Sequence, residues 1–452
     1  MSGKSVLLIS ANTELTPAPV YPLALPRLAS ALRRAGHTVR QFDVLVHGLD
    51  SLPGALKQLP PHLIAVSLRN IDNTDAYKPR LYVDDYRQLI KLIRASSSAP
   101  VVIGGSAFSL FPGRLMNALG ADFGIVGPGE ETLCRLLDAV DSSKLDKIPN
   151  LFTTDSAPAS FASSSPAMTD LHHAPDILDY YWRNGGMIGL QTKRGCPNNC
   201  SYCTYPLIDG SVVQWAEPGR VVDEIEKLLV DKGVDYFFIV DSLFNVSAEQ
   251  EQLFAEEISR RSLKISWGAF FSPSAMDRRY IGILKQSGLK HVEFGTDSLC
   301  DAMLDSFRKN FSVADVLRTS ELCTEMGLFV AHYLIFGGPG ETADTISRTL
   351  QNTGRLDKCF FFPFPGVRIY PRTAICDTAV AQGVISSDDD CLEPKFYFAK
   401  PFTHSTIWQY IENHLDDSRR WFLPGKTDMI NRSLGRLRAK GKKGPLWEYM
   451  LV

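Results

Sequence analysis

The first part of the chain alternates short apolar runs with amphipathic stretches. Segments such as 25–35 and 84–95 repeat apolar residues at helical spacing. The apolar runs between them end in polar or glycine positions and lie at residues 5–10, 38–43, 63–68, 101–104 and 123–126. Short buried strands separated by amphipathic helices predict an α/β fold, a doubly wound parallel sheet over residues 1–140. Its ligand site is expected beyond the carboxyl ends of the strands.

The alternation stops and then returns. Residues 153–166 are rich in Ser, Pro and Ala, which predicts a surface excursion within a linker at 141–185. Strand patterns follow at 187–193, 236–241, 265–271, 291–295, 329–336 and 367–370. Helical segments between them lie at 220–232, 248–261, 313–326 and 342–356. These units predict a partial (β/α)6 TIM barrel over residues 186–390, with its chemistry at the carboxyl ends of the strands. Residues 391–452 predict a small helical C-terminal cap.

Composition narrows the class of protein. Lys+Arg at 48 against Asp+Glu at 50 gives a net charge of −2, which offers no overall attraction to nucleic acid or anionic membrane. The first apolar run is too short for a signal peptide, and no apolar stretch approaches the ~18–20 residues of a membrane span. With no secretion signal, the nine cysteines favour metal ligation over disulfides. We therefore expect a cytoplasmic protein.

Three cysteines crowd into one short loop after the first barrel strand. Cys196, Cys200 and Cys203 have the spacing C-x3-C-x2-C, which allows each thiolate to hold one iron of a [4Fe–4S] cluster and leaves the fourth iron open. The alternatives are a structural zinc site, which needs a fourth ligand, and a redox thiol pair, which has no use for a third cysteine. The spacing favours the cluster.

The cysteine loop, with Tyr202 before its last cysteine, resembles the signature of the radical S-adenosylmethionine enzymes. The resemblance continues at residues 241–245, 293–298 and 337–341, although the Gly-Gly-Glu segment usual after the second strand is missing. It implies S-adenosylmethionine on the open iron. Glu293 is implied as a catalytic residue, either a hydrogen-bonding group or a ligand of the cluster. Contacts to S-adenosylmethionine are implied for Asp241, Asn245, Asp297, Ser298, Gly337 and Gly338. For Asp241, Asn245 and Asp297 the alternative is that they cap helices.

The N-terminal segments 25–39, 101–106 and 124–132 are similar to cobalamin-binding domains that precede such barrels. The usual Asp-x-His-x-x-Gly is absent, so no histidine is expected below cobalt. Arg69 is expected there instead, as a catalytic residue, unless it pairs with Asp72. A dinucleotide site is unlikely without G-x-G-x-x-G after the first strand. The resemblance implies cobalamin contacts from Ser67, Arg69, Asn70, Gly104, Gly105, Ser106, Gly127, Gly129 and Glu130.

Together these features identify a resemblance to the cobalamin-dependent (class B) radical S-adenosylmethionine methyltransferases. The resemblance implies methyl transfer from S-adenosylmethionine, through cobalamin, to a carbon of a small substrate such as tryptophan, with flavodoxin or ferredoxin as reductant. The alternatives are a cyclase or rearrangement enzyme with the same cofactors, an RNA methylthiotransferase and a non-catalytic sensor. Candidate substrate-facing residues are His332, Tyr333, Arg368 and Tyr370, each of which has packing as its alternative.

Overall fold

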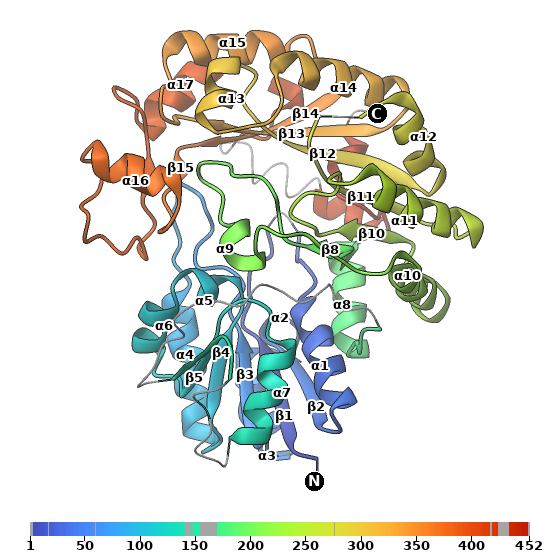
Figure 1. Cartoon of the computed structure of the whole chain (residues 1–452), viewed down its shortest axis with the longest axis vertical. Helices are drawn as coiled ribbons and strands as arrows, with labels where there is room; N and C mark the ends of the chain where they lie inside the picture. Colours follow the sequence, from blue (N-terminus) through green and yellow to red (C-terminus); the bar gives the residue numbers. More distant parts are fainter. Residues whose placement is uncertain are drawn as a thin grey trace.

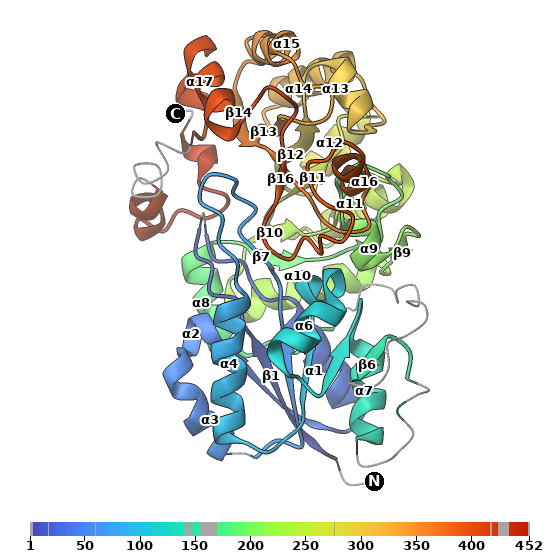
Figure 2. The same cartoon turned by 90° about the vertical axis from the view of Figure 1, so that its left-hand side faces the viewer.

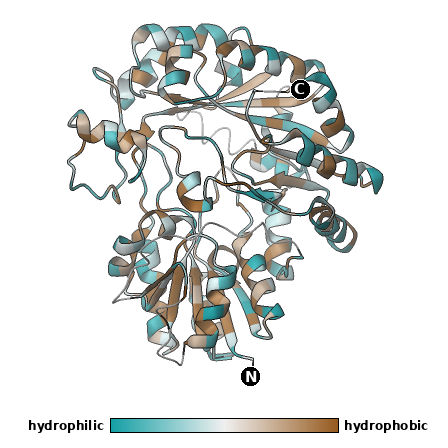
Figure 3. Cartoon of the chain, viewed as in Figure 1, coloured by the Kyte–Doolittle hydropathy of each residue, from teal (hydrophilic) through white to brown (hydrophobic). Residues whose placement is uncertain are grey.

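A computed structural model describes residues 3–16, 18–58, 60–140, 145, 148–153, 170–274, 276–415, 418–423 and 434–450. Two six-stranded sheets form the two halves of the molecule, one above the other in Figure 1. Most of the predicted surface excursion, residues 154–166, lies outside the described part of the chain. Apolar residues gather in the strands of both sheets, and polar residues gather on the outer helices (Figure 3).

The N-terminal half has a sheet covered by helices on both faces (Figure 2). Its strands are β1 (Ser5–Ser10), β2 (Thr38–Asp43), β3 (Leu63–Ser67), β4 (Val101–Gly104), β5 (Phe123–Ile125) and β6 (Leu151–Thr153). Its helices are α1 (Ala24–Arg34), α2 (Val44–His47), η1 (Leu49–Ser51), α3 (Leu52–Gln58), α4 (Val83–Ser96), α5 (Ser106–Leu110), α6 (Pro112–Leu119) and α7 (Glu130–Ala139). The strand order is β2-β1-β3-β4-β5-β6, and only β6 is antiparallel to its neighbour. The predicted doubly wound sheet is confirmed, and β6 extends it past residue 140.

Strand β1 shows why its residues form a central strand. All six of its residues are buried. Val6 and Leu8 share a core with α1 and α7, while Leu7 and Ile9 share a core with α3 and α4. Because alternate side chains of a strand point to opposite faces, a continuous apolar run is what a sheet covered on both faces requires.

The second half is a parallel sheet of strand order β14-β13-β12-β11-β10-β7 with helices on its outer face. The strands are β7 (Ile188–Leu190), β10 (Tyr236–Ile239), β11 (Ser266–Phe271), β12 (Leu289–Asp297), β13 (Phe329–Phe336) and β14 (Cys359–Pro365). The helices are α10 (Pro218–Lys232), α11 (Ala248–Arg260), α12 (Arg278–Gln286), α13 (Asp301–Ser306), α14 (Val313–Glu325) and α15 (Ala343–Thr353). This arrangement matches the predicted partial barrel.

The sixth barrel strand is not the one that the sequence predicted. Residues 367–370 were expected to form it, but β14 pairs with β13 in that place. Val367 and Arg368 form β15 (Val367–Arg368), which pairs with β16 (Phe396–Tyr397) in a separate small sheet. Pro363 and Pro365 make the sequence of β14 look unlike a strand, because proline is rare in the interior of a strand. An edge strand tolerates proline, since one side of it makes no ladder hydrogen bonds.

The remaining elements belong to neither six-stranded sheet. They are α8 (Pro175–Gly185), β8 (Lys193–Arg194), α9 (Tyr205–Asp209), β9 (Gln214–Trp215), α16 (Ala374–Ala381), α17 (His404–His414), η3 (Ser418–Arg420) and η5 (Trp447–Tyr449). Buried ion pairs cross between the halves, with Arg194 on Glu130 and Arg368 Nε 2.8 Å from Asp72 Oδ2. Within the described ranges, no helix is long and apolar enough to cross a membrane.

Candidate functional site

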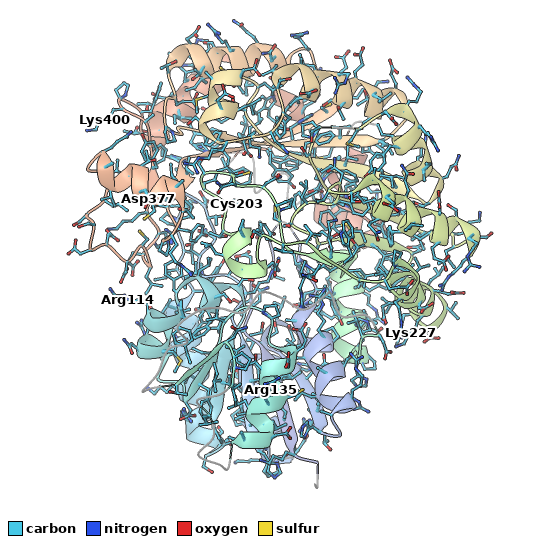
Figure 4. The ribbon with its side chains drawn as sticks, viewed as in Figure 1. Arg114, Arg135, Cys203, Lys227, Asp377 and Lys400 are labelled. Atoms are coloured by element: carbon cyan, nitrogen blue, oxygen red, sulfur yellow. The ribbon has the colours of Figure 1, made fainter. Side chains whose placement is uncertain are left out.

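The three predicted cluster cysteines lie on one loop between β8 and α9, and Figure 4 labels Cys203 there. Cys196 is buried, and Cys200 and Cys203 are partly buried. The loop folds back on itself, because the Cys203 amide donates to the Cys200 carbonyl at 3.2 Å and the Cys196 amide donates to the Gly210 carbonyl at 3.0 Å. The charges of Cys196 and Cys200 both act on Cys203. The three thiols therefore share one site.

The structure argues against the two other interpretations of these cysteines. A redox thiol pair would leave one of the three thiols that share this site without a role. Among the described residues, no three His, Cys, Asp or Glu side chains lie close enough to hold a single metal ion, as a zinc site requires. A cubane cluster instead takes each thiolate on a different iron. The loop fits a [4Fe–4S] cluster.

A buried polar group supports the second half of this loop. The Tyr202 hydroxyl donates to Asp297 Oδ2 at 2.6 Å, and Lys309 Nζ lies 2.8 Å from the same oxygen. Burial alone would lower the pKa of Lys309, but the charges of Asp297 and then Cys200 raise it, so the amine is held as a cation. One carboxylate oxygen of Asp297, a predicted contact of S-adenosylmethionine, therefore binds the cysteine loop through Tyr202.

Asp241 and Asn245, two further predicted contacts, follow β10. Asp241 is buried, accepts from the Thr192 amide at 2.9 Å and pairs with Lys193 Nζ at 3.0 Å. The Asn245 amide exchanges two hydrogen bonds with the backbone of Ser272, at 2.8 and 2.7 Å, and lines a cavity of about 220 Å³ beside the cysteine loop. Asn245 therefore lines an open space next to the loop.

The helix-capping alternative is wrong for these aspartates and asparagine. The N-cap of α11 is Ser247 and that of α13 is Cys300, so Asp241, Asn245 and Asp297 cap neither helix.

The remaining predicted contacts of S-adenosylmethionine are Ser298, Gly337 and Gly338. The Ser298 hydroxyl is 2.9 Å from Thr349 Oγ1, and the Gly337 amide donates to Glu341 at 3.1 Å. A Cβ on Gly338 would lie 2.5 Å from the Phe307 ring. Gly338 therefore permits the close packing of the segment that supports the loop.

Glu293 lies on the inner face of β12 and is 4% exposed. The Tyr333 hydroxyl donates to its Oε2 at 2.8 Å, the Trp447 side chain also donates to it, and His291 Nε2 lies 3.6 Å from its Oε1. Burial raises the pKa of Glu293 above its usual value, and nearby His291 opposes that shift. These contacts hold the carboxylate in place, and its expected role, as a hydrogen-bonding group or as a ligand of the cluster, stays a prediction.

The four candidate substrate-facing residues lie in three different places. The Tyr333 ring lies on the inner face of the sheet, where it stacks on Phe362 with ring centroids 5.0 Å apart. His332 points outward, 2.7 Å from Thr296 Oγ1, so the expectation that it faces the substrate is wrong. Arg368 and its neighbour Tyr370 lie in the small sheet region, where Arg368 binds Asp72.

A cavity of about 330 Å³ lies between the two halves. It is lined by all but one of the predicted cobalamin contacts, namely Ser67, Arg69, Gly104, Gly105, Ser106, Gly127, Gly129 and Glu130. Asn70 is the exception: its carbonyl accepts a hydrogen bond from Tyr86. The barrel half contributes Gln191, Arg194, Tyr205, Ile208, Asp209 and Val240. The cavity therefore lies where the carboxyl ends of both sheets meet.

The floor of this cavity is made largely of backbone. Gly105 has φ +97° and ψ −179°, a conformation open essentially to glycine alone, and a Cβ there would lie 2.6 Å from the Leu68 carbonyl oxygen. At Gly127 a Cβ would meet nothing closer than 3.7 Å, so its absence leaves free space. Exposed backbone and free space at these two glycines fit a broad planar ligand such as a corrin ring.

Arg69 is the charged group of this floor. It follows β3 and reaches the cavity, and burial lowers the pKa of its guanidinium. The alternative pairing with Asp72 is wrong, since Asp72 binds Arg368. In the described part of the chain no carboxylate pairs with Arg69, and none of the cavity-lining residues is a histidine.

Sequence reasoning missed several polar residues at these sites. Gln191 lines the cavity with a buried Oε1 that has no hydrogen-bond partner, and Arg194 binds Glu130 across the two halves. Lys309 pairs with Asp297. Both Gln191 and Arg194 adjoin the end of a barrel strand, which is a signal that could have found them. Lys309 carries no such signal, because it follows a helix turn.

Comparison with known proteins agrees with this geometry. Residues 11–137 match the B12 binding domain family, and residues 190–352 match the Radical SAM superfamily. The chain is 28% identical to a tryptophan 2-C-methyltransferase of Streptomyces laurentii over 84% of this chain and 75% of that protein. It is 26% identical to an anaerobic magnesium-protoporphyrin IX monomethyl ester cyclase of Cereibacter sphaeroides, over 73% and 56% of the two chains.

Solved structures extend the likeness to the whole chain. The methyltransferase TsrM of Kitasatospora setae, with cobalamin and a [4Fe–4S] cluster bound, superposes with a TM-score of 0.87 at 25% identity over 99% of this chain and 97% of that one. The structure of TsrM with tryptophan and a SAM analogue gives 0.88. The chain thus combines a B12 binding domain and a Radical SAM domain in this order, and with its cysteine loop and shared cavity it is similar to the cobalamin-dependent radical S-adenosylmethionine methyltransferases.

Proposed function

We propose that this chain methylates a carbon of a small aromatic substrate such as tryptophan, with the cavity between the halves as its cobalamin site. The observation that carries the proposal is that residues from both halves line this one cavity, with Gly105 on one side and Val240 on the other. A ligand held there touches the carboxyl ends of the barrel strands, where barrel enzymes perform their chemistry. Cobalamin supplies, when bound, a cobalt centre that accepts and releases a methyl group.

The residues of this chain then have distinct tasks. Cys196, Cys200 and Cys203 hold the cluster. Gly105 lets the backbone approach the corrin, and Arg69 places a positive charge on the face where a histidine is absent. Because none of the residues that line the cavity is a histidine, Arg69 would supply a bound cobalamin with a charge and not with an imidazole ligand.

The aromatic rings on the inner face of the barrel sheet suit a flat substrate. Tyr333 stacks on Phe362 and lies 6.1 Å from the ring of Phe364, which is 42% exposed although it points toward the barrel interior. Aromatic rings stack with offset partners at such distances. The similarity to a tryptophan methyltransferase supports the same class of substrate. An external one-electron donor such as flavodoxin or ferredoxin, in a reducing cytoplasm, completes the proposal.

The test is anaerobic purification with cobalamin, followed by assay with tryptophan and methyl-labelled S-adenosylmethionine. We expect about four irons per chain, about one cobalamin, and label in the product. Cys203→Ser is expected to lose most of the iron, while Cys134→Ser, on α7 of the other half, keeps it. Iron without stoichiometric cobalamin would overturn the cavity assignment. An altered substrate without label would favour the cyclase or rearrangement alternative, which the similarity to the cyclase keeps in view.

A further inference from the structure

The cysteine loop rests on a buried ion pair that the proposed reaction does not use. The Lys309 side chain is 9% exposed and that of Asp297 is 3% exposed, with Nζ and Oδ2 2.8 Å apart. The hydroxyl of Tyr202, between Cys200 and Cys203 of the loop, donates to the same carboxylate oxygen at 2.6 Å. A charged pair is thus tied directly to the segment that carries two cluster ligands.

The backbone holds this pair in place. Asp297 ends β12 with φ +61°, a conformation unusual for a residue other than glycine, where the register with β13 shifts. The Ser201 amide donates to the Phe307 carbonyl at 3.1 Å, and the Lys309 amide donates to the Leu304 carbonyl at 2.9 Å. The end of α13 therefore carries both the ammonium and an anchor for the loop.

The other lysine beside the loop is arranged differently. Lys193 precedes the loop, and its ammonium binds Asp241 at 3.0 Å and the Phe244 carbonyl at 2.6 Å. It lies 4.5 Å from the centre of the Trp215 ring, on the side of β8 and β9. The charge of Lys309, in contrast, acts on Cys200 and Cys203.

We propose that Lys309 sets the reduction potential of the cluster by holding a positive charge against the Cys200 and Cys203 half of the loop. Asp297 and Tyr202 are positioning residues, because they fix the ammonium relative to the loop. The proposal rests on the cluster assigned to these cysteines. One-electron reduction by an external donor adds one negative charge to the cluster, and a nearby cation stabilises that reduced form. Charges around a cluster tune its potential in this way.

The ion pair of Lys309 and Asp297 allows a test in which two substitutions shift the midpoint potential in opposite directions. Lys309→Met removes the cation and leaves Asp297, so the midpoint potential is expected to become more negative. A tenfold change in the reduction equilibrium corresponds to about 59 mV for one electron. Asp297→Asn removes the anion and leaves the cation, so the potential is expected to become more positive. Lys309→Arg keeps the charge and is expected to stay near the original value.

The measurement is a redox titration of the anaerobically reconstituted protein, with dithionite as donor and the reduced cluster followed by electron paramagnetic resonance. Iron and sulfide are counted for every variant. Lys232→Met is the matched control: it removes a lysine that lies 3.8 Å from Asp179, on the outer helix α10 (Figure 1). Its potential is expected to stay unchanged.

The outcomes are distinct. Opposite shifts of the midpoint potential in Lys309→Met and Asp297→Asn support the proposal. Shifts of the same sign, or unchanged potentials in variants that keep about four irons, would overturn it. If Lys309→Met loses its iron, the sign of the shift in Asp297→Asn decides. A wild-type protein that binds no cluster, or binds no cobalamin, contradicts the proposed function instead, and a cluster alone is enough to test Lys309.

Discussion

The carboxyl ends of the two sheets differ in how they use backbone and charge. The N-terminal sheet offers backbone at Gly105 and Gly127, and a cation, Arg69, with no carboxylate beside it. The barrel sheet offers charged side chains that are buried in pairs, Lys193 with Asp241 and Lys309 with Asp297. A broad planar ligand needs free space and close backbone approach, whereas a metal cluster and its charged co-substrate need fixed charges. Each surface therefore matches the ligand proposed for it.

The comparison predicts its largest effect on the barrel side. Asp241 and Lys193 are 0% and 1% exposed at their side chains, so neutralising Asp241 leaves a buried ammonium without its counter-charge. Asp241→Asn is expected to lower the free energy of unfolding by about 3–5 kcal/mol, as breaking a buried ion pair does. If the Asn side chain keeps its oxygen toward the Thr192 and Lys193 amides, its NH2 group faces the Lys193 ammonium, which is itself a donor. Urea denaturation of the cofactor-free protein measures the change.

An exposed pair is the control for this prediction. Arg278 and Glu325 lie 2.6 Å apart with side chains 64% and 51% exposed. Glu325→Gln is expected to change stability by less than about 0.5 kcal/mol, because solvent screens such pairs. If Asp241→Asn lowers the free energy of unfolding as little as Glu325→Gln does, the stability of the barrel edge does not depend on paired charges. The contrast between the two sheets would then be wrong.

The two surfaces were not equally visible in the sequence. The cysteine loop and the glycine turns are contiguous, so their spacing alone predicted where they lie. The ion pairs join distant residues: Asp72 and Arg368 are 296 positions apart, and no local pattern links them. Arg69 was therefore left with Asp72 as a candidate partner that the fold gives to Arg368. Similarly, a Phe-rich run with Pro363 looked unlike a strand until its place at the sheet edge was known.

The next effect tests the backbone surface. Gly105→Ala is expected to destabilise the N-terminal half by about 1–3 kcal/mol, the cost of a non-glycine residue in this region of φ and ψ, with the contact to the Leu68 carbonyl in addition. Cobalamin binding is expected to weaken as well, because the turn after β4 must shift. Thermal unfolding and the cobalamin content after gel filtration measure the two effects.

The control for Gly105→Ala is a substitution at a glycine whose backbone conformation is ordinary. Gly113 lies in α6, without a positive φ, and a Cβ there would meet nothing within 4 Å. Gly113→Ala is expected to be neutral or to stabilise the protein by up to about 1 kcal/mol, since alanine favours helix. Equal losses in both variants would contradict the special role given to the Gly105 turn.

The smallest effect on stability is expected at Arg69, and it is the sharpest contrast with Asp241. Burial lowers the pKa of Arg69, and the tyrosines around it, Tyr205 first, only partly oppose that shift. Its charge therefore does not stabilise the empty fold. Arg69→Met, which keeps the aliphatic stem, is expected to leave the free energy of unfolding within about 0.5 kcal/mol of the wild-type value or to raise it. The visible spectrum of bound cobalamin is expected to change in the same variant, because the charge below the ring is gone. A loss of stability comparable to that of Asp241→Asn, with an unchanged spectrum, would mean that Arg69 is a structural residue and that both sheets use charge in the same way.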